Sequence, residues 1–238
     1  MADGLFRLRM RFHKWGRLSY LSHLEVVRAQ ERMVRRAGLP FAVTCGFSPH
    51  MKIAFGPALG VGTAGFEEYI DIWLREYVDP EEALSRLQHA SVPDLMPEQV
   101  RYVHERETSL VAALNIAHYR VTCGHGPVAD GTVFQAALDE VVGRGSIEVE
   151  RRKPSKKGAL TKTLDLTHLV YRRPVCRQVD EGVCEIDLWT RLENTGALRP
   201  EVLVAEVAKV SSSDIEVVGL ERVELFCEED GTLTKPLA

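Results

Sequence analysis

Along the first half of the chain, the pattern of apolar and polar residues changes between the alternation typical of strands and the spacing typical of helices. Between residues 5 and 13 apolar and basic positions alternate, which indicates a strand with one buried face. Ser22 and Glu25 then have the spacing of a capping box, and Gly38 with Pro40 marks the end of the helix that they begin. Extended segments are expected at residues 41–44 and 52–55, a strand at 69–74, a helix at 81–90 and a last strand at 99–104.

The second half of the chain predicts strands and helices in the same order. A strand is expected at residues 119–123 and a helix at residues 133–142. Extended segments at residues 147–151 and 163–166 together take the place of the second strand. A strand at residues 185–190, a helix at 200–210 and a strand at 216–226 complete this half.

Short sequence echoes link the two halves. The run EYIDIWL at residues 68–74 is echoed by CEIDLW at 184–189, and DPEEAL at 79–84 is echoed by RPEVL at 199–203. Because both echoes occur in the same order, they indicate a duplication. A strand–helix–strand–strand–helix–strand unit is the ferredoxin-like arrangement. The predicted fold is therefore α+β, a tandem duplication of this unit at residues 1–110 and 111–238, with Asp71 and Asp187 in equivalent strands.

Charge alternates in step with the repeat. Lys and Arg outnumber Asp and Glu in residues 1–62 and 111–178, and are outnumbered by them in residues 63–110 and 179–238. In the usual ferredoxin-like strand order, 4-1-3-2, this pattern makes the edge at strand 2 basic and the edge at strand 4 acidic. The net charge of −4 is therefore compatible with an anionic partner, because the protein is expected to be dipolar.

Composition limits the classes of function. No apolar run approaches the roughly 20 residues that span a bilayer, and the N-terminal residues lack the apolar core of a signal peptide. A cytoplasmic protein without membrane contact is expected. The five cysteines are scattered and none has C-x-x-C spacing, which favours reduced thiols and excludes an iron–sulfur cluster held by this chain alone. No metal site and no cofactor are predicted, and the glycine-rich stretch 56–62 lacks the Lys and Ser/Thr of a phosphate-binding loop.

Two stretches of the first half concentrate side chains that bind or react. One lies at the start of the first helix and the other between two extended segments, so both can lie near one end of a sheet. His23 is at the first helical position, where the positive end of the helix dipole suits it to bind an anion or exchange a proton. His23 could equally be an exposed first-turn residue, and Phe47 and Pro49 could simply shape a turn. The candidate substrate-binding residues are Arg17, Tyr20, Ser22, His23, Phe47, Pro49, His50 and Lys52.

Basic residues gather in two further places that suit an anionic polymer. Four arginines of the first helix recur at i, i+4 and i+7 or i+8, along one helix face. Residues 151–162 form a basic hairpin that could clamp phosphates. The alternative is a solvated surface, and the aromatic motif of an RNA-recognition sheet is missing. The predicted phosphate contacts are Arg28, Arg32, Arg35, Arg36, Arg151, Arg152, Lys153, Lys156, Lys157 and Lys162.

Three motifs resemble those of a bacterial family. They are FHKWGRLSYLSHLE at residues 12–25, RRAGLP at 35–40 and GFSPHMKI at 46–53. The chain is similar to the uncharacterised radical-SAM-linked domain family, whose members are fused to, or encoded beside, a radical S-adenosylmethionine protein. The resemblance covers nearly the whole chain and implies such a protein as partner. Genes of this family often lie near those of an E/G-type ribonuclease and of ribosomal proteins, which implies RNA or a ribosomal component as a further partner.

Three hypotheses for the function follow. The first is a non-catalytic partner that binds RNA or a ribonucleoprotein and presents it to a radical S-adenosylmethionine enzyme. The second is a metal-independent endoribonuclease of the CRISPR repeat-processing type, in which His23 acts as general acid or base and Lys52 stabilises the phosphorane. The third is a protein–protein scaffold. Whether the chain is an enzyme, what its substrate is and how it oligomerises do not follow from its residues.

Overall fold

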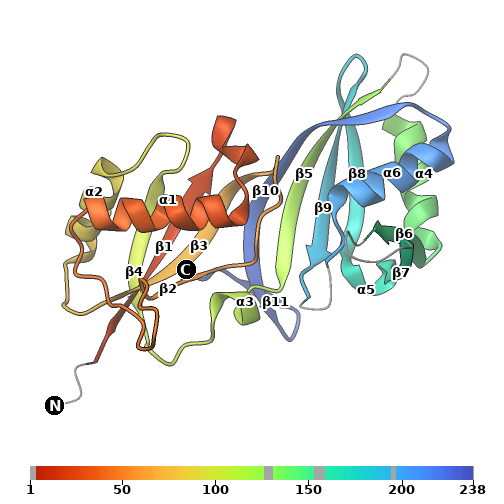
Figure 1. Cartoon of the computed structure of the whole chain (residues 1–238). Coiled ribbons are helices and arrows are strands. Elements are labelled where there is room, and N and C mark those ends of the chain that lie inside the picture. The colour runs from red at the N-terminus through yellow and green to blue at the C-terminus, as the bar shows by residue number, and fades with distance from the viewer. Residues whose placement is uncertain (1–3, 126–130, 153–158, 194–196, 238) are drawn as a thin grey trace. The chain divides into compact units, whose positions relative to one another are not determined.

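The computed structural model describes residues 4–125, 131–152, 159–193 and 197–237, and the chain divides into two compact units (Figure 1). The first unit comprises Met1–Asn115 and Arg222–Ala238, and the second comprises Ile116–Glu221. The sequence pattern places all of residues 111–238 in the second unit. The difference arises mainly from strand β10 (Ile215–Glu229), which begins in the second unit and ends in the first.

The first unit has the strand order of a ferredoxin-like fold. Strands β4, β1 and β3 are neighbours in that order, and β2 pairs with β3, which gives the order 4-1-3-2. The end of the chain adds β11 (Thr232–Thr234), which pairs with β10, and a short helix α3 (Leu110–Ala113) follows β4. The remaining elements are β1 (Phe6–Lys14), the 3-10 helix η1 (Gly16–Tyr20), α1 (His23–Arg36), β2 (Ile53–Phe55), β3 (Ala64–Leu74), α2 (Pro80–His89) and β4 (Pro97–Val103).

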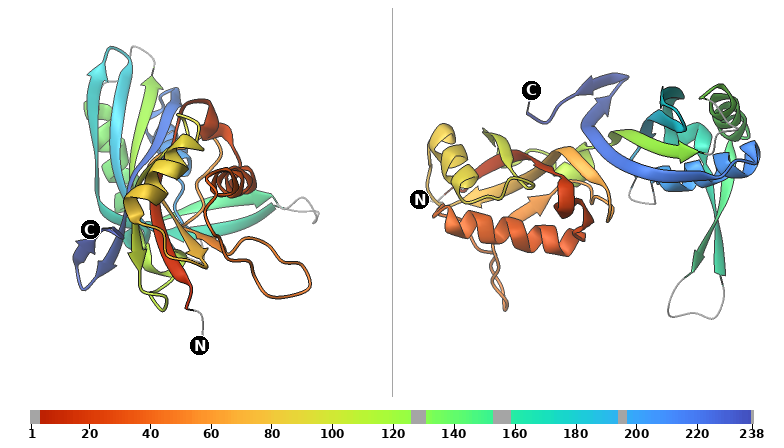
Figure 2. Two further views of the ribbon diagram at one scale, coloured as in Figure 1. Left: turned by 90° about the vertical axis from the view of Figure 1, so that its left-hand side faces the viewer. Right: turned by 90° about the horizontal axis from the view of Figure 1, so that it is seen from above.

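The core of the first unit forms where α1 and α2 pack on one face of the sheet (Figure 2). Along β1 the side chains alternate, so Leu8, Met10 and Phe12 are buried in this core while Arg7 and Arg9 point to the opposite face. Full burial of an apolar side chain of this size contributes about 1.5–3 kcal/mol. The alternation of apolar and basic residues therefore decides which face of β1 the helices cover.

Capping residues define where the two helices begin. The Ser22 N–H donates to Glu25 Oε2 at 2.8 Å, which is one half of the predicted capping box. At the start of α2 the Glu81 N–H donates to Asp79 Oδ1 at 2.9 Å, and Pro80 occupies the first turn, where its missing N–H loses no helical hydrogen bond. Both helix starts were predictable because these signals are local in sequence.

The second unit repeats the strand order of the first, with one insertion. Its strands run β10-β5-β9-β8, which is again 4-1-3-2. The predicted extended segments at residues 147–151 and 163–166 are confirmed as strands, but their predicted place as second strand of the main sheet is wrong, because they form a separate two-stranded sheet, β6–β7. The elements are β5 (Ile116–His125), α4 (Gly131–Gly143), β6 (Ser146–Arg152), β7 (Ala159–Asp165), α5 (Leu166–Leu169), β8 (Val170–Asp180), β9 (Val183–Arg191) and α6 (Pro200–Ser211).

Strand β8 is absent from the sequence prediction because its residues do not read as a strand. It contains Pro174 and several charged residues, and its pairing with β9 is interrupted by register shifts. Proline, charge and bulges are the features of an edge strand, since an edge needs neither a full ladder of donors nor two buried faces. The hairpin β6–β7 has the clearer alternation, although it does not join the main sheet.

Equivalent positions of the two units carry the same residue types. Asp71 lies on β3 opposite Arg9 of β1, and Asp187 lies on β9 opposite Arg120 of β5. Both aspartates therefore occupy the third strand of their units, as the sequence echo predicts. This correspondence is compatible with a duplication.

A tryptophan two residues further along each third strand shows the same correspondence. Lys52 lies over the Trp73 ring at 5.0 Å from its centroid, and Arg172 lies over the Trp189 ring at 4.3 Å. Arg172 lies on β8, which pairs with the third strand β9. Lys52 directly precedes β2, which pairs with the third strand β3.

None of the helices in the described part of the chain is long and apolar enough to cross a membrane.

Candidate nucleic-acid interface

The outer face of α1 carries a row of arginines. Arg28, Arg32 and Arg35 lie on this face, while the other side of the helix buries Val26 and Met33 in the core. At 1.5 Å per residue the three arginines span about 10 Å along the helix axis. Among the described residues, Arg28 and Arg32 form no salt bridge, and the Arg35 guanidinium lies over the Phe41 ring at 5.5 Å. A ring contact leaves the N–H donors of a guanidinium group in place, so all three arginines of this row can bind an anion.

Arg36 differs from the other three predicted arginines. Its Nη2 donates to the Ala90 carbonyl oxygen at 2.5 Å, and its Nε donates to the same oxygen at 3.2 Å. The Arg36 side chain therefore caps the C-terminus of α2. We assign Arg36 to the packing of the two helices and leave it out of the candidate interface.

The 3-10 helix η1 precedes α1 and presents two of the predicted site residues. In a 3-10 helix residues i and i+3 lie on the same side, so Arg17 and Tyr20 share one face of η1. Both are exposed, and Tyr20 is 71% accessible to solvent. Trp15, at the start of η1, is 46% exposed and contacts the edge of Phe66. Two aromatic rings therefore flank η1.

A buried lysine forms hydrogen bonds with the backbone of η1 and of the residue that follows it. Lys14 is 2% exposed, and its ammonium group donates to the carbonyl oxygens of Ser19 at 2.9 Å and Leu21 at 3.4 Å. Burial lowers the pKa of Lys14, and the neighbouring charge of Glu68 offsets part of this effect. Sequence reasoning did not single out Lys14. The available signal was a lysine at an inward position of a strand whose other inward residues are apolar.

Glycine at position 16 is required by the start of η1. Its φ angle is +54°, in the left-handed region that favours glycine, and an added Cβ would lie 2.7 Å from Asp94 Oδ2. The Trp15 N–H also donates to the Asp94 carbonyl oxygen at 3.0 Å, and Ser19 Oγ donates to the Gly16 carbonyl oxygen at 2.8 Å. The backbone of η1 is therefore held on several sides.

The two candidate catalytic residues do not come together. The His23 ring meets the edge of the Phe55 ring at 5.4 Å, on the side of the sheet that the helices cover. Lys52 lies over Trp73, which lies on β3 between the core residues Ile72 and Leu74 and so faces away from the helices. His23 and Lys52 are therefore on different sides of the sheet. Ser22, a further candidate, is the N-cap residue of α1.

The second predicted stretch forms a loop that projects from the body of the first unit in both views of Figure 2. Its base is anchored, because Ala42 and Met51 are buried and the Ala42 N–H donates to the Trp73 carbonyl oxygen at 2.7 Å. At its tip Phe47 is wholly exposed and Pro49 and His50 are exposed. This loop is separate from η1, so the eight substrate-binding candidates do not form one site.

The predicted basic hairpin is β6–β7. Lys153, Lys156 and Lys157 lie outside the described residues. Of the others, Arg151 and Arg152 are on β6, and Lys162 is on β7 opposite Val149. The hairpin that the sequence predicts is thus present, and its role in phosphate binding stays a prediction.

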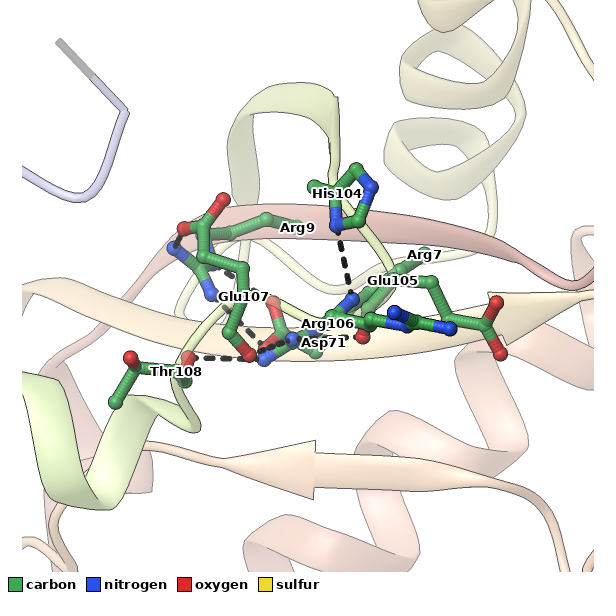
Figure 3. Close-up of polar contacts among 8 residues, drawn as sticks. All are labelled: Arg7, Arg9, Asp71, His104, Glu105, Arg106, Glu107 and Thr108. Carbon is green, nitrogen blue, oxygen red and sulfur yellow. Dashed lines mark hydrogen bonds and ion pairs between the residues drawn. The ribbon is translucent and has the colours of Figure 1, made fainter.

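Two arginines on the face of the sheet opposite the helices pair with a buried carboxylate (Figure 3). Arg9 Nε donates to Asp71 Oδ1 at 2.8 Å, and Arg7 Nη2 donates to Asp71 Oδ2 at 2.6 Å. Although burial lowers the pKa of Arg9, the hydrogen bond to Asp71 and the charges of Asp71 and Glu107 raise it above its usual value. Both arginines are charged and paired.

The same two arginines bind the segment that follows β4. Arg9 forms a salt bridge with Glu107 at 2.6 Å, and Arg7 donates to the carbonyl oxygens of residues 105, 107 and 108 (Figure 3). Their hydrogen-bonding capacity is used inside the protein, so they are not available to phosphates. The basic character of β1 therefore serves the fold, and the outer face of α1 is the better candidate for a nucleic acid.

Potential metal-ligating groups and thiols are two further kinds of reactive side chain in the described residues. No group of three or more His, Cys, Asp or Glu side chains there is placed to hold a metal ion. The cysteines are free thiols, and interaction with Cys184 together with burial raises the pKa values of Cys123 and Cys176. Thiols with a raised pKa are poor nucleophiles and poor metal ligands, because the thiolate is the reactive form.

Fold and surface together define a two-unit α+β protein with an arginine row on its first long helix and an aromatic-flanked 3-10 helix. A family model described as "Uncharacterized protein conserved in bacteria (DUF2344)" matches residues 7–200, and the chain belongs to this family. None of the curated proteins compared with the chain matches it.

One solved structure shows a similar fold. One chain of the crystal structure of a Cbf5-Nop10-Gar1 complex is 13% identical, with a TM-score of 0.50 over 96% of this chain and 52% of that chain. The present chain thus spans about half the length of that chain. At this identity the similarity concerns the fold alone. An unknown protein from Galdieria sulphuraria is 11% identical over 93% of this chain and 100% of its own, but its TM-score of 0.24 supports no argument.

Proposed function

We propose that the chain is a non-catalytic partner of a radical S-adenosylmethionine enzyme and binds RNA or a ribonucleoprotein substrate through α1 and η1. The observation that carries the RNA-binding part is the row of Arg28, Arg32 and Arg35 on the outer face of α1. Guanidinium groups bind phosphate oxygens in a fixed fork geometry and are more weakly hydrated than an ammonium group. A row about 10 Å long can meet successive phosphates of one strand.

The non-catalytic part is supported by where the candidate residues lie. General acid–base cleavage of RNA needs the proton donor and the phosphorane-stabilising cation at one phosphate. His23 contacts Phe55 and Lys52 contacts Trp73, on opposite sides of the sheet. The endoribonuclease hypothesis is therefore the weaker one for these two residues.

The protein partner is supported by the projecting loop. Phe47 is wholly exposed at its tip, and residues 44–50 carry no Lys, Arg, Asp or Glu. An exposed aromatic side chain without nearby charge fits an apolar pocket of a protein better than it fits a phosphate backbone. The identity of that protein as a radical S-adenosylmethionine enzyme rests on the sequence resemblance.

The salt dependence of RNA binding tests the interface. We expect replacement of Arg28, Arg32 and Arg35 by Ala to reduce the log–log salt slope by roughly two to three units, about 0.7–1 unit for each phosphate that the variant no longer neutralises. The control replaces Arg75, Arg86 and Arg106, which lie in other parts of the first unit. Equal changes in both variants, or no binding by the unchanged chain at about 50 mM salt, where phosphate binding is strongest, would contradict the assignment.

A further inference from the structure

The pair formed by Arg17 and Tyr20 on η1 suggests which kind of RNA this surface takes. We infer that Tyr20 stacks on an unpaired base while Arg17 meets the adjoining phosphate, so that the RNA is single-stranded where it crosses η1. The inference rests on the proposed function and adds the substrate class. Its basis is the shared face of the two side chains in the 3-10 helix and the 71% exposure of Tyr20.

The backbone next to Tyr20 is held by hydrogen bonds. The Ser19 carbonyl oxygen accepts from Lys14 Nζ at 2.9 Å and from the Gly62 N–H at 3.0 Å, which fixes the residue before Tyr20 from two sides. The lysine that makes one of these contacts is itself buried, and burial lowers its pKa. Because this backbone is held in place before binding, its ordering costs little conformational entropy when a base stacks on the side chain of Tyr20.

The surroundings of Tyr20 suit a base more than a charged protein surface. The glycine-rich segment beside it, residues 56–66, contains no charged residue, and the nearest atom to an added Cβ at Gly62 would be a Tyr20 ring carbon. On the other side α1 begins, with the carboxylate of Glu25 turned back to Ser22 and Arg28 one turn further. Hydrogen bonding to Ser22 lowers the pKa of Glu25, so its charge is engaged locally.

Base stacking on a protein ring requires a base that is free to leave its neighbours. In an A-form duplex the bases are stacked inside and the major groove is too deep and narrow for side chains to read. Proteins that hold single strands combine aromatic stacking platforms with a basic track for the backbone. Here Tyr20 supplies the platform, Arg17 on η1 lies beside it, and Arg28 and Arg32 supply the basic track along α1.

The test compares one labelled RNA of about 12 nucleotides, within the range of known single-strand sites, with the same strand annealed to its complement. The unchanged chain is expected to bind the single strand more tightly. Replacing Tyr20 by Ala should weaken single-strand binding about five- to 150-fold, and leave duplex binding unchanged. Tyr20→Phe should retain the preference because the ring remains. Phe47→Ala, the matched change at another exposed aromatic residue, should have no effect on either RNA.

The outcomes separate the inference from the function on which it rests. Equal binding of duplex and single strand, or equal weakening of both by Tyr20→Ala, overturns the inference while RNA binding stands. An effect of Phe47→Ala as large as that of Tyr20→Ala also overturns it, because any exposed ring would then serve. Binding of neither RNA contradicts the proposed function itself.

Discussion

Replacing Asp71 by Asn is expected to lower the free energy of unfolding of the first unit by about 3–5 kcal/mol, because two buried guanidinium groups are left without their counter-charge. The side chains of Arg7 and Arg9 are each 3% exposed and that of Asp71 is fully buried, so water cannot replace the carboxylate. Asn is nearly isosteric and can still accept hydrogen bonds. The destabilisation therefore reports the charge and not a cavity. Urea unfolding of the two proteins measures it.

The matched control for Asp71→Asn is Glu107→Gln. Glu107 binds the same Arg9, at 2.6 Å, but its side chain is 41% exposed. Solvent can therefore compensate for most of the missing charge, and a destabilisation of less than about 1 kcal/mol is expected. Similar destabilisation in both variants would show that burial of Asp71 does not set the strength of this cluster.

Replacing Arg222 by Met is expected to cost about 3–5 kcal/mol as well, because Glu68 then remains charged and buried without its partner. Arg222 Nε donates to Glu68 Oε1 at 2.8 Å and Nη2 donates to Oε2 at 2.5 Å, with 2% and 7% of the two side chains exposed. The double change Arg222→Met with Glu68→Gln should recover part of the stability, since it removes the unpaired carboxylate.

An exposed ion pair provides the comparison for Arg222. Arg120 contacts Glu221 at 3.2 Å, and their side chains are 44% and 32% exposed. Arg120→Met should therefore cost well under about 1 kcal/mol. The account of Arg222 fails if the two arginine variants unfold at the same urea concentration, or if the double change is as unstable as Arg222→Met alone.

Local sequence signals predicted most elements of the first unit. The capping box at Ser22 and the Asp79-Pro80 pair mark the helix starts, and the alternation along β1 marks its buried face. Strand β8 could not be predicted in the same way, because an edge strand with Pro174 lacks the regular alternation on which the prediction depends. The hairpin β6–β7 shows that alternation, so its residues are predicted as the second strand, a position that β8 occupies in the structure.

Of the candidate interface, the sequence predicts only the residues whose exposure follows from their spacing along a helix. The spacing of Arg28, Arg32 and Arg35 is enough to place them on one outer face of α1. Long-range partners are invisible in a sequence, so the binding of Arg36 to the end of α2 and the burial of Lys14 under η1 could not be foreseen. For the same reason, the sequence offers His23 and Lys52 as candidates for one site although they lie on opposite faces.

Co-purification tests the central claim, an RNA-binding partner of a radical S-adenosylmethionine enzyme, most directly. The chain is co-expressed with a radical S-adenosylmethionine enzyme of the kind that the sequence resemblance implies, captured, and its bound RNA is sequenced before and after ribonuclease treatment. We expect enzyme and RNA both to be captured. The Arg28, Arg32 and Arg35 triple variant should lose the RNA but keep the enzyme, and Phe47→Ser should lose the enzyme but keep the RNA. Capture of neither RNA nor enzyme, or absence of both from each variant, would contradict the claim.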